Sequence, residues 1–447
     1  MPHRLRLGPT ASFALLVSIV LAFLSASTAP TPLYAVYQRE WGFSPITTTV
    51  VFAAYAIAVL VSLLIVGRVS DHIGRRPMLF AALALQIVAM VVFTSAGSVG
   101  ALLTARIVQG VATGSAVGAI GAGMLDLDRT RGALANSFAP VLGTSLGALM
   151  SGLAVQYLSW PTHLIYVVLI CVFVLQGLAL TRMPETVTRK PGALASLRPD
   201  VKLPRPARGP FAVVAPVIFA VWALAGFYGA LAPALTGVLV GSHDAVYGGL
   251  GLTTLAGAGA IAVLLLRKAP ARTVMLVGVP ALVVGVAVVL VSVGDGGGGA
   301  ASVSGFFVGT ALAGIGFGAG FQVGIRLVVP VVEAHERGGV LSLLYVVTYL
   351  GMGIPAVIGG VLVVHGGGLV TTAREYGVAV IVLALLALAG LLLGGGRLQP
   401  AGPRVVIEGS SGRQDRSAGA GRGTAEAGRA SHAPVAAAAE RRRGDLD

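Results

Sequence analysis

The sequence is short of charge: 11% of its 447 residues are Asp, Glu, Lys or Arg, whereas 56% are hydrophobic and 63 are glycine. Soluble domains carry about 25% charged residues, because their surface must face water. This deficit excludes an ordinary soluble enzyme, a disordered chain and a fibrous repeat. The composition instead indicates a protein with many membrane-spanning segments.

Cysteine is almost absent. Cys171 is the single cysteine, and it lies inside an apolar run, where we expect it to pack against its neighbours. One cysteine cannot form a disulfide within the chain or a cysteine-based metal site. The seven histidines are scattered, and no nucleophile motif or phosphate-binding lysine loop accompanies them. We therefore expect no enzyme active site, no metal and no cofactor.

Acidic residues are also scarce, since 17 Asp and Glu stand against 31 Lys and Arg, for a net charge of +14. The basic residues form short clusters between apolar runs and no stripe with interleaved aromatic residues, so we do not expect a nucleic-acid partner. Every carboxylate lies in a loop, in the C-terminal tail or near the end of an apolar run. The middle of the apolar runs therefore lacks acidic groups.

Long runs without charge are the dominant feature of the chain. A helix that crosses the hydrocarbon core needs roughly 20 apolar residues, and twelve runs meet this length. We expect spans at 11–33, 46–67, 78–97, 99–124, 133–156, 162–181, 211–238, 247–266, 273–293, 301–325, 339–364 and 376–394. The stretches 133–181 and 211–266 also allow other divisions, and the first run also resembles a signal peptide. The predicted fold class is an all-α membrane protein with twelve transmembrane helices.

The two halves of the chain repeat at an offset of roughly 200 residues. Span one begins near residue 11 and span seven near 211, and the loops before spans five and eleven read Arg131-Gly-Ala-Leu and Arg337-Gly-Gly-Val. This pattern predicts two parallel six-helix bundles, joined by a polar linker with seven basic residues against two acidic ones and followed by a disordered basic tail. We place the two bundles at 1–181 and 211–396, the linker between them at 182–210 and the tail at 397–447.

The loop charges predict an orientation in the bilayer. With the N-terminus inside, almost all basic loop residues face the cytoplasm, and only Arg39 and Arg374 fall on the opposite side. Lys and Arg are enriched in cytoplasmic loops of membrane proteins. We expect a multi-pass protein of the cell membrane with both termini in the cytoplasm.

The most informative motif is the loop between spans two and three, which reads Gly67-Arg-Val-Ser-Asp-His-Ile-Gly-Arg-Arg-Pro77. It resembles the loop signature of the major facilitator superfamily, Gly-x-Leu-Ala-Asp-Arg-x-Gly-Arg-Lys/Arg. Val69 replaces the leucine and His72 the first arginine. The residues that agree with the signature are Gly67, Asp71, Gly74, Arg75 and Arg76.

This resemblance implies a gating role for the loop. A carboxylate is stabilised at the positive N-terminal end of a helix. In the family the aspartate of the loop meets span eleven, whose start here would be near Arg337 to Val340. We therefore expect Asp71 to lie against that helix. A plainer interpretation treats Arg75 and Arg76 as topology determinants alone.

Two further motifs resemble the same family. Arg106 and Gln109 in span four match its Arg-x-x-Gln-Gly pattern, and their spacing places both on one helix face. The resemblance links such an arginine to proton coupling, whereas a structural arginine is the alternative. In span five, Pro140 and Gly143 keep part of the antiporter motif, and Gly147 continues a face of small residues that also suits plain helix packing.

The cargo is inferred from the polar residues of the spans. Transporters of this kind bind near the middle of the bilayer between their halves. The candidate cavity residues, for each of which helix packing is an alternative, are Ser27, Thr28, Trp222, Tyr228, Gln322, Arg326, Tyr345 and Tyr349. Because none is acidic, we expect a neutral or weakly anionic cargo and not a lipophilic cation.

The combined features predict a secondary transporter. The resemblance implies alternating access, proton-coupled efflux of a small organic molecule and function as a monomer. An importer of a small metabolite is the nearest alternative, and a membrane scaffold or sensor without transport is an alternative of another class.

Overall fold

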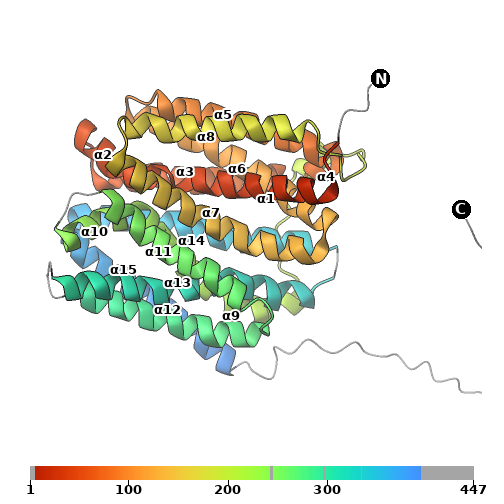
Figure 1. Cartoon of the computed structure of the whole chain (residues 1–447). Helices are drawn as coiled ribbons and strands as arrows, with labels where there is room; N and C mark the ends of the chain where they lie inside the picture. The colour runs from red at the N-terminus through yellow and green to blue at the C-terminus, as the bar shows by residue number, and fades with distance from the viewer. Residues whose placement is uncertain (1–5, 242–244, 295–298, 334, 394–447) are drawn as a thin grey trace, which may run out of the picture. The chain divides into compact units, whose positions relative to one another are not determined.

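The computed structural model describes residues 6–241, 245–294, 299–333 and 335–393, and the predicted tail lies outside these ranges. The secondary structure of the first half is a series of α-helices (Figure 1). Its helices are α1 (Pro9–Thr28), α2 (Pro30–Trp41), α3 (Pro45–Val66), α4 (Ser70–Ile73), α5 (Arg75–Thr94), α6 (Val99–Leu127), α7 (Arg129–Tyr157) and α8 (Pro161–Leu180).

The linker and the second half are helical as well. Two short 3-10 helices lie in the linker, η1 (Ala195–Leu197) and η2 (Arg205–Ala207), and a third follows α13 as η3 (Val329–Val331). The α-helices are α9 (Arg208–Ala230), α10 (Ala232–Val240), α11 (Ala245–Leu265), α12 (Ala271–Gly294), α13 (Ala300–Val328), α14 (Arg337–His365) and α15 (Gly368–Leu393).

The sequence determines many helix ends locally. Proline occupies the first turn of α1, α2, α3 and α8, where its missing N–H leaves no hydrogen bond unmade. Ser98 and Asp128 precede α6 and α7, and their side chains accept hydrogen bonds from the backbone N–H groups of Ala101 and Arg131. Gly42 ends α2 with a φ of 67°, a conformation that favours glycine.

The prediction of twelve spans is confirmed, since twelve described helical segments are long and apolar enough to cross a membrane. The first and last segments extend beyond their predicted bounds. Pro30 starts α2 directly after α1. The first helical segment therefore continues to Trp41, whereas the predicted span ended near residue 33. Gly367 and Gly368, with φ of 106° and 88°, turn the chain before α15, which therefore starts eight residues earlier than the predicted 376.

The second half repeats the helix pattern of the first. Helix starts recur at an offset of about 200 residues, and α6 and α13, like α7 and α14, have 29 residues each. In each half, a short helix directly follows the first long one: α2 follows α1, and α10 follows α9. Figure 1 shows the helices of the first half and those of the second as two adjoining groups. The division into two bundles that move as units remains a prediction.

The two most extensive contacts between the halves are each made by one pair of helices. Helix α3 packs against α14, and α7 against α11. The second contact contains a reciprocal pair of hydrogen bonds, since Ser145 Oγ donates to the carbonyl of Thr253 at 3.1 Å and Thr253 Oγ1 donates to that of Ser145 at 3.3 Å. Backbones approach closely where one helix offers glycine: a Cβ on Gly360 of α14 would lie 2.2 Å from Thr49 Oγ1 of α3.

One surface of α8 is apolar and exposed. Val167, Val174, Leu175 and Leu178 are between 42% and 65% exposed, as expected for side chains that face lipid. Cys171 lies on this helix and is exposed too. The expectation that Cys171 packs against neighbouring helices was therefore wrong, because an apolar run does not reveal which of its faces meets lipid.

Candidate functional site

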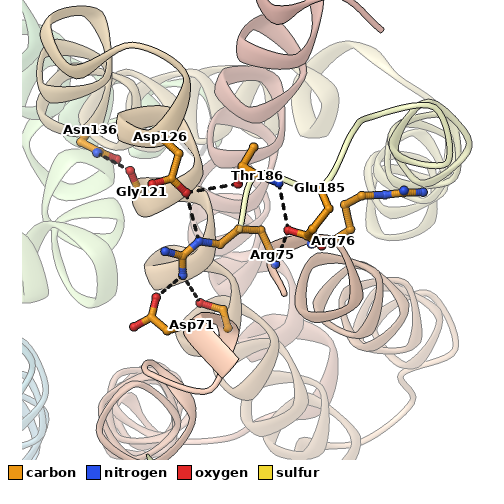
Figure 2. A network of polar contacts seen from close by, with 9 residues as sticks. Asp71, Arg75, Arg76, Gly121, Asp126, Asn136, Glu185 and Thr186 are labelled. Atoms are coloured by element: carbon orange, nitrogen blue, oxygen red, sulfur yellow. Dashed lines mark hydrogen bonds and ion pairs between the residues drawn. The ribbon is translucent and has the colours of Figure 1, made fainter. Parts of the chain in front are cut away.

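The loop between α3 and α5 is organised around Arg75, whose side chain is only 7% exposed. Its Nη1 donates to Ser70 Oγ at 2.7 Å and to Asp71 Oδ1 at 2.5 Å, and its Nε donates to Asp126 Oδ2 of α6 at 3.4 Å. Figure 2 shows Arg75 between the two carboxylates. Hydrogen bonds between charged groups are stronger than neutral ones. Arg75 thus ties the loop to the end of α6.

The segment after α8 completes this network. Glu185 Oε1 accepts from the backbone N–H of Arg75 at 2.8 Å, and its Oε2 accepts from that of Arg76 at 3.1 Å, so that a carboxylate caps the start of α5 (Figure 2). Thr186 Oγ1 donates to Asp126 Oδ2 at 3.1 Å. The sequence does not reveal this cap, because Glu185 lies 110 residues from Arg75.

Two glycines of the loop motif have steric roles. Gly74 adopts a φ of 106°, and a Cβ there would lie 2.7 Å from Glu185 Oε2, so a side chain would obstruct the cap. A Cβ on Gly118 of α6 would lie 2.9 Å from the carbonyl oxygen of Gly67, which shows how closely α6 passes the loop. Arg76 bonds through Nη2 to the carbonyl of Thr181 at 2.9 Å. All five predicted loop residues therefore lie around one junction of α3, α5 and α6.

Asp71 differs from the expectation in one respect. Its side chain is 54% exposed and its ion pair is with Arg75 of its own loop. The carboxylate beside the first turn of α14 is that of Asp200 in the linker, whose Oδ1 lies 3.5 Å from the place of a Cβ on Gly339. A carboxylate does therefore face the start of span eleven, but the linker supplies it.

The linker contacts both halves at this point. Asp200 forms ion pairs with Arg68, at the end of α3, at 3.6 Å and with Lys202 at 3.2 Å. The backbone N–H of Lys202 donates to the carbonyl of Gly339 in α14 at 3.4 Å. Nearer its start, the linker bonds to the loop as well, because the N–H of Lys190 donates to the carbonyl of His72 at 3.0 Å. Residues 190–202 therefore bridge the loop of the first half and α14 of the second.

We predict that Asp200→Asn loosens this bridge. Partly exposed ion pairs contribute about 0.2–1 kcal/mol each, so losing two is expected to raise trypsin cleavage after Lys202 about three- to ten-fold. The measurement is the rate of limited digestion of the purified chain. Glu333→Gln is the control, because Glu333 is 80% exposed and its ion pair in the described part of the chain is with His335. Equal rates in the Asp200 variant and the parent chain would contradict the bridge.

A second polar centre surrounds Arg106, which is fully buried in α6. Its Nε donates to Tyr34 Oη at 2.7 Å, and its Nη1 donates to the carbonyl of Ser27 at 2.7 Å and to Gln109 Oε1 at 2.8 Å. Gln109 Nε2 in turn donates to the carbonyl of Ala26 at 2.9 Å. As predicted, Arg106 and Gln109 share one face, and that face meets the end of α1.

Aromatic rings enclose the same guanidinium. Arg106 Cζ lies 5.4 Å from the ring centre of Tyr34, 5.2 Å from that of Tyr55 and 5.9 Å from that of Phe93. These rings come from α2, α3 and α5, and each attracts a cation placed over its face. Sequence reasoning identified the arginine but none of the three rings, because their separation in the sequence carries no sign of their convergence.

The predicted cavity residues of the second half are only partly together. Trp222 lies 6.2 Å from Tyr349 and 5.6 Å from Phe317, measured between ring centres. Tyr228 is instead buried against α13, where its hydroxyl is 2.6 Å from Thr310 Oγ1. The other predicted residues here, Gln322 and Tyr345, lie on α13 and α14.

Arg326 has a different position from the predicted one. Its guanidinium donates to the carbonyls of Leu266, Arg267 and Ala269, at 3.4, 3.2 and 3.0 Å. These carbonyls lie just beyond α11. Carbonyl groups at the C-terminal end of a helix lack hydrogen-bond donors within the helix, and a cation can donate to them. The placement of Arg326 among cavity residues is therefore corrected: it caps a helix end.

The small residues of α7 form a packing surface against α1. A Cβ on Gly147 would lie 2.1 Å from the carbonyl oxygen of Ser25, and one on Gly143 would lie 2.7 Å from that of Leu21. Ser25 Oγ donates to the carbonyl of Gly143 at 2.9 Å, and Thr28 Oγ1 to that of Thr144 at 3.0 Å. Pro140 lies within α7, one turn before Gly143. The motif thus lets two helices of the first half approach closely.

Within the described residues, no three His, Cys, Asp or Glu side chains gather as metal ligands. The twelve spans, the buried polar centre and the ion-pair network at the helix ends define a polytopic membrane transporter. A sequence profile of the Major Facilitator Superfamily matches residues 15–310. The chain belongs to this superfamily, a family of transporters and not of enzymes.

Individual relatives are distant. Multidrug resistance protein D of Escherichia coli (strain K12) is 29% identical over 178 residues, which are 38% of this chain and 44% of that protein. The transporter paaT of Penicillium rubens is 26% identical over 152 residues, 33% of this chain and 28% of that one. The chain thus aligns with less than half the length of these relatives. The crystal structure of a mutant of the nucleoside transporter NupG has the same fold, with a TM-score of 0.62, 11% identity and coverage of 87% of this chain and 100% of NupG.

Proposed function

We propose that this secondary transporter exports a small organic molecule in exchange for protons, acts as a monomer, and alternates access by rocking residues 1–181 against 211–396. The Asp71–Arg75–Asp126 cluster carries the proposal, because it is an ion-pair network at the junction of three helices, where rocking would remake contacts. The name of the Escherichia coli relative, a multidrug resistance protein, supports the direction of transport.

The orientation follows from the charged loops. The loop between α3 and α5, the linker and the loop between α11 and α12 all carry basic clusters, and they belong to one side if the N-terminus is cytoplasmic. On this assignment, the Arg75 cluster and the Asp200 bridge lie at the cytoplasmic side. Gly360 and Thr49 then lie at the opposite side.

The packing along α3 and α14 supports an alternating mechanism. Toward the proposed outer side, Gly360 of α14 closely approaches Thr49 of α3. Toward the proposed cytoplasmic side, Lys202 of the linker contacts Gly339, and Asp71 is half exposed. We take this arrangement as the state with its outer side closed. In the other state, Asp71 is expected to replace the linker beside α14.

The test is transport into proteoliposomes that contain the purified chain, with an imposed pH gradient and a panel of neutral, acidic and permanently cationic compounds. We expect saturable, gradient-dependent movement of neutral or acidic compounds, with proton flux in the opposite direction. Movement in the same direction as protons would identify an importer. Absence of any substrate-dependent proton flux would contradict transport by proton exchange.

We predict that Asp71→Asn lowers the transport rate while membrane insertion stays normal. The change removes one charge from the ion pair with Arg75 and the carboxylate that would meet α14 in the other state. The measurement is the initial rate per inserted protein. Glu375→Gln is the control, because Glu375 is an exposed carboxylate on α15, outside this cluster. An unchanged rate in Asp71→Asn would remove Asp71 from the mechanism.

A further inference from the structure

The charge of Arg106 lacks an anionic partner among the described residues. The acceptors of its hydrogen bonds are a hydroxyl, a backbone carbonyl and a side-chain amide, all of them neutral. The carboxylates that form ion pairs in the described chain belong to other clusters, such as those of Arg75 and Asp200. A buried cation without a counterion is costly, so the site favours the arrival of a negative charge.

One nitrogen of the guanidinium, which carries two N–H donors, is also unused. Nη2 of Arg106 is fully enclosed and has no hydrogen-bond acceptor in the described structure. An unpaired buried donor destabilises the folded state, and a charged one does so more strongly. The rings of Tyr34, Tyr55 and Phe93 attract the cation but carry no net charge to compensate it. The site therefore has both a free donor and an excess of positive charge.

The position of Tyr55 connects this centre with the junction of the halves. Tyr55 lies on α3, which packs against α14, and its ring is the one nearest to the guanidinium. A shift of Tyr55 would uncover Arg106 toward the seam at which the two halves meet, which is where a transporter of this family binds its cargo.

We propose that Arg106, gated by the Tyr55 ring, binds the carboxylate of a small organic acid, so that the cargo class is monocarboxylates. The proposal rests on the proposed function, since it names the cargo of the same transporter. The carboxylate would accept from Nη2 and supply the missing negative charge.

The test is ligand binding to the purified full-length chain in detergent, followed by thermal unfolding, because a ligand that binds the folded state raises its stability. The probes are formate, acetate, benzoate and 2-naphthoate, each compared with its amide, and chloride as an inorganic anion. We expect at least ten-fold tighter binding of one or more acids than of the matched amides. Equal binding of acids and amides, binding of chloride alone, or no binding of any probe would overturn the proposal.

Two substitutions locate the binding. Arg106→Gln is expected to abolish the preference for acids. Gln109→Glu places a carboxylate where Oε1 now accepts from Nη1 at 2.8 Å, so it should neutralise Arg106 internally and weaken acid binding at least ten-fold while leaving the arginine in place. Gln176→Glu is the matched control, because it adds the same charge to α8, where the amide contacts Ser18. Unchanged acid binding in Gln109→Glu would overturn the proposal even if Arg106→Gln fails to fold.

This assay separates the two proposals. Binding to the purified chain needs neither a membrane nor a gradient. Acid binding without any proton-linked flux would contradict proton-coupled export and leave the carboxylate site standing. Proton-linked export of neutral compounds without acid-selective binding would contradict the carboxylate site alone.

Discussion

Replacing Arg75 by glutamine is expected to lower the transport rate at least about ten-fold, which corresponds to about 1.4 kcal/mol. The substitution removes the bonds to Ser70, Asp71 and Asp126 together and leaves two neighbouring carboxylates without their shared cation. Bonds to charged groups contribute about 1.5–3 kcal/mol each, and the partial exposure of both acids places the expected loss at the low end. The measurement is the initial rate in proteoliposomes per inserted protein.

The neighbouring arginine provides the matched control for this prediction. Arg76→Gln changes the same charge in the same turn but removes a bond to the backbone of Thr181 only. We expect a rate within about five-fold of the parent chain, because bonds of this kind contribute about 1 kcal/mol or less. Similar losses in both variants would show that the loop acts through its total charge and not through the Arg75 network.

Gly147→Ala is expected to have the largest effect on folding. Its methyl group would lie 2.1 Å from the carbonyl oxygen of Ser25 and 2.4 Å from Thr28 Oγ1, so α7 and α1 would have to separate. Overpacking costs about 1–3 kcal/mol and more when backbone must move, and the hydrogen bonds of Ser25 and Thr28 to α7 would be lost with it. The measurement is thermal unfolding of the purified chain, together with the fraction that elutes as a single species.

Gly177→Ala is the matched control for this change. Gly177 also lies within a span, but a Cβ there would meet no atom within 4 Å. Alanine is the better helix former by about 0.8–1 kcal/mol, so we expect unchanged or slightly higher stability. If both alanine variants unfold at the temperature of the parent chain, the close approach of α7 to α1 is not required for stability.

The fold was predictable from the sequence because its determinants are local. Apolar runs of membrane length set the twelve spans, and prolines and glycines mark many of their ends. Two ends were missed for local reasons too. Pro30 starts a new helix instead of ending the span, and the apolar residues after Gly368 start α15 before its charged residues Arg374 and Glu375.

The site was less predictable because its contacts are not local. The motif identified Asp71 and Arg75, but the linker between the halves looked like a polar connector, and nothing marked Asp200 as the acid that faces α14. Arg106 was visible as a charge within a span, yet the rings around it come from three other helices. Arg326 was visible in the same way, but it bonds to backbone carbonyls at the end of a helix, whereas Arg106 is enclosed by side chains. A charged residue in an apolar run indicates that its side chain has polar partners in the fold, but the sequence does not identify those partners.

The exposed position of Cys171 has a practical consequence for measuring the motion. A thiol on the lipid-facing side of α8 can be removed by a conservative change to serine or alanine without leaving a hole in the core. One substitution then yields a background free of thiols. Pairs of spin labels or fluorophores, for example at positions 68 and 337, can be attached to that background, and the distance between them followed through a transport cycle.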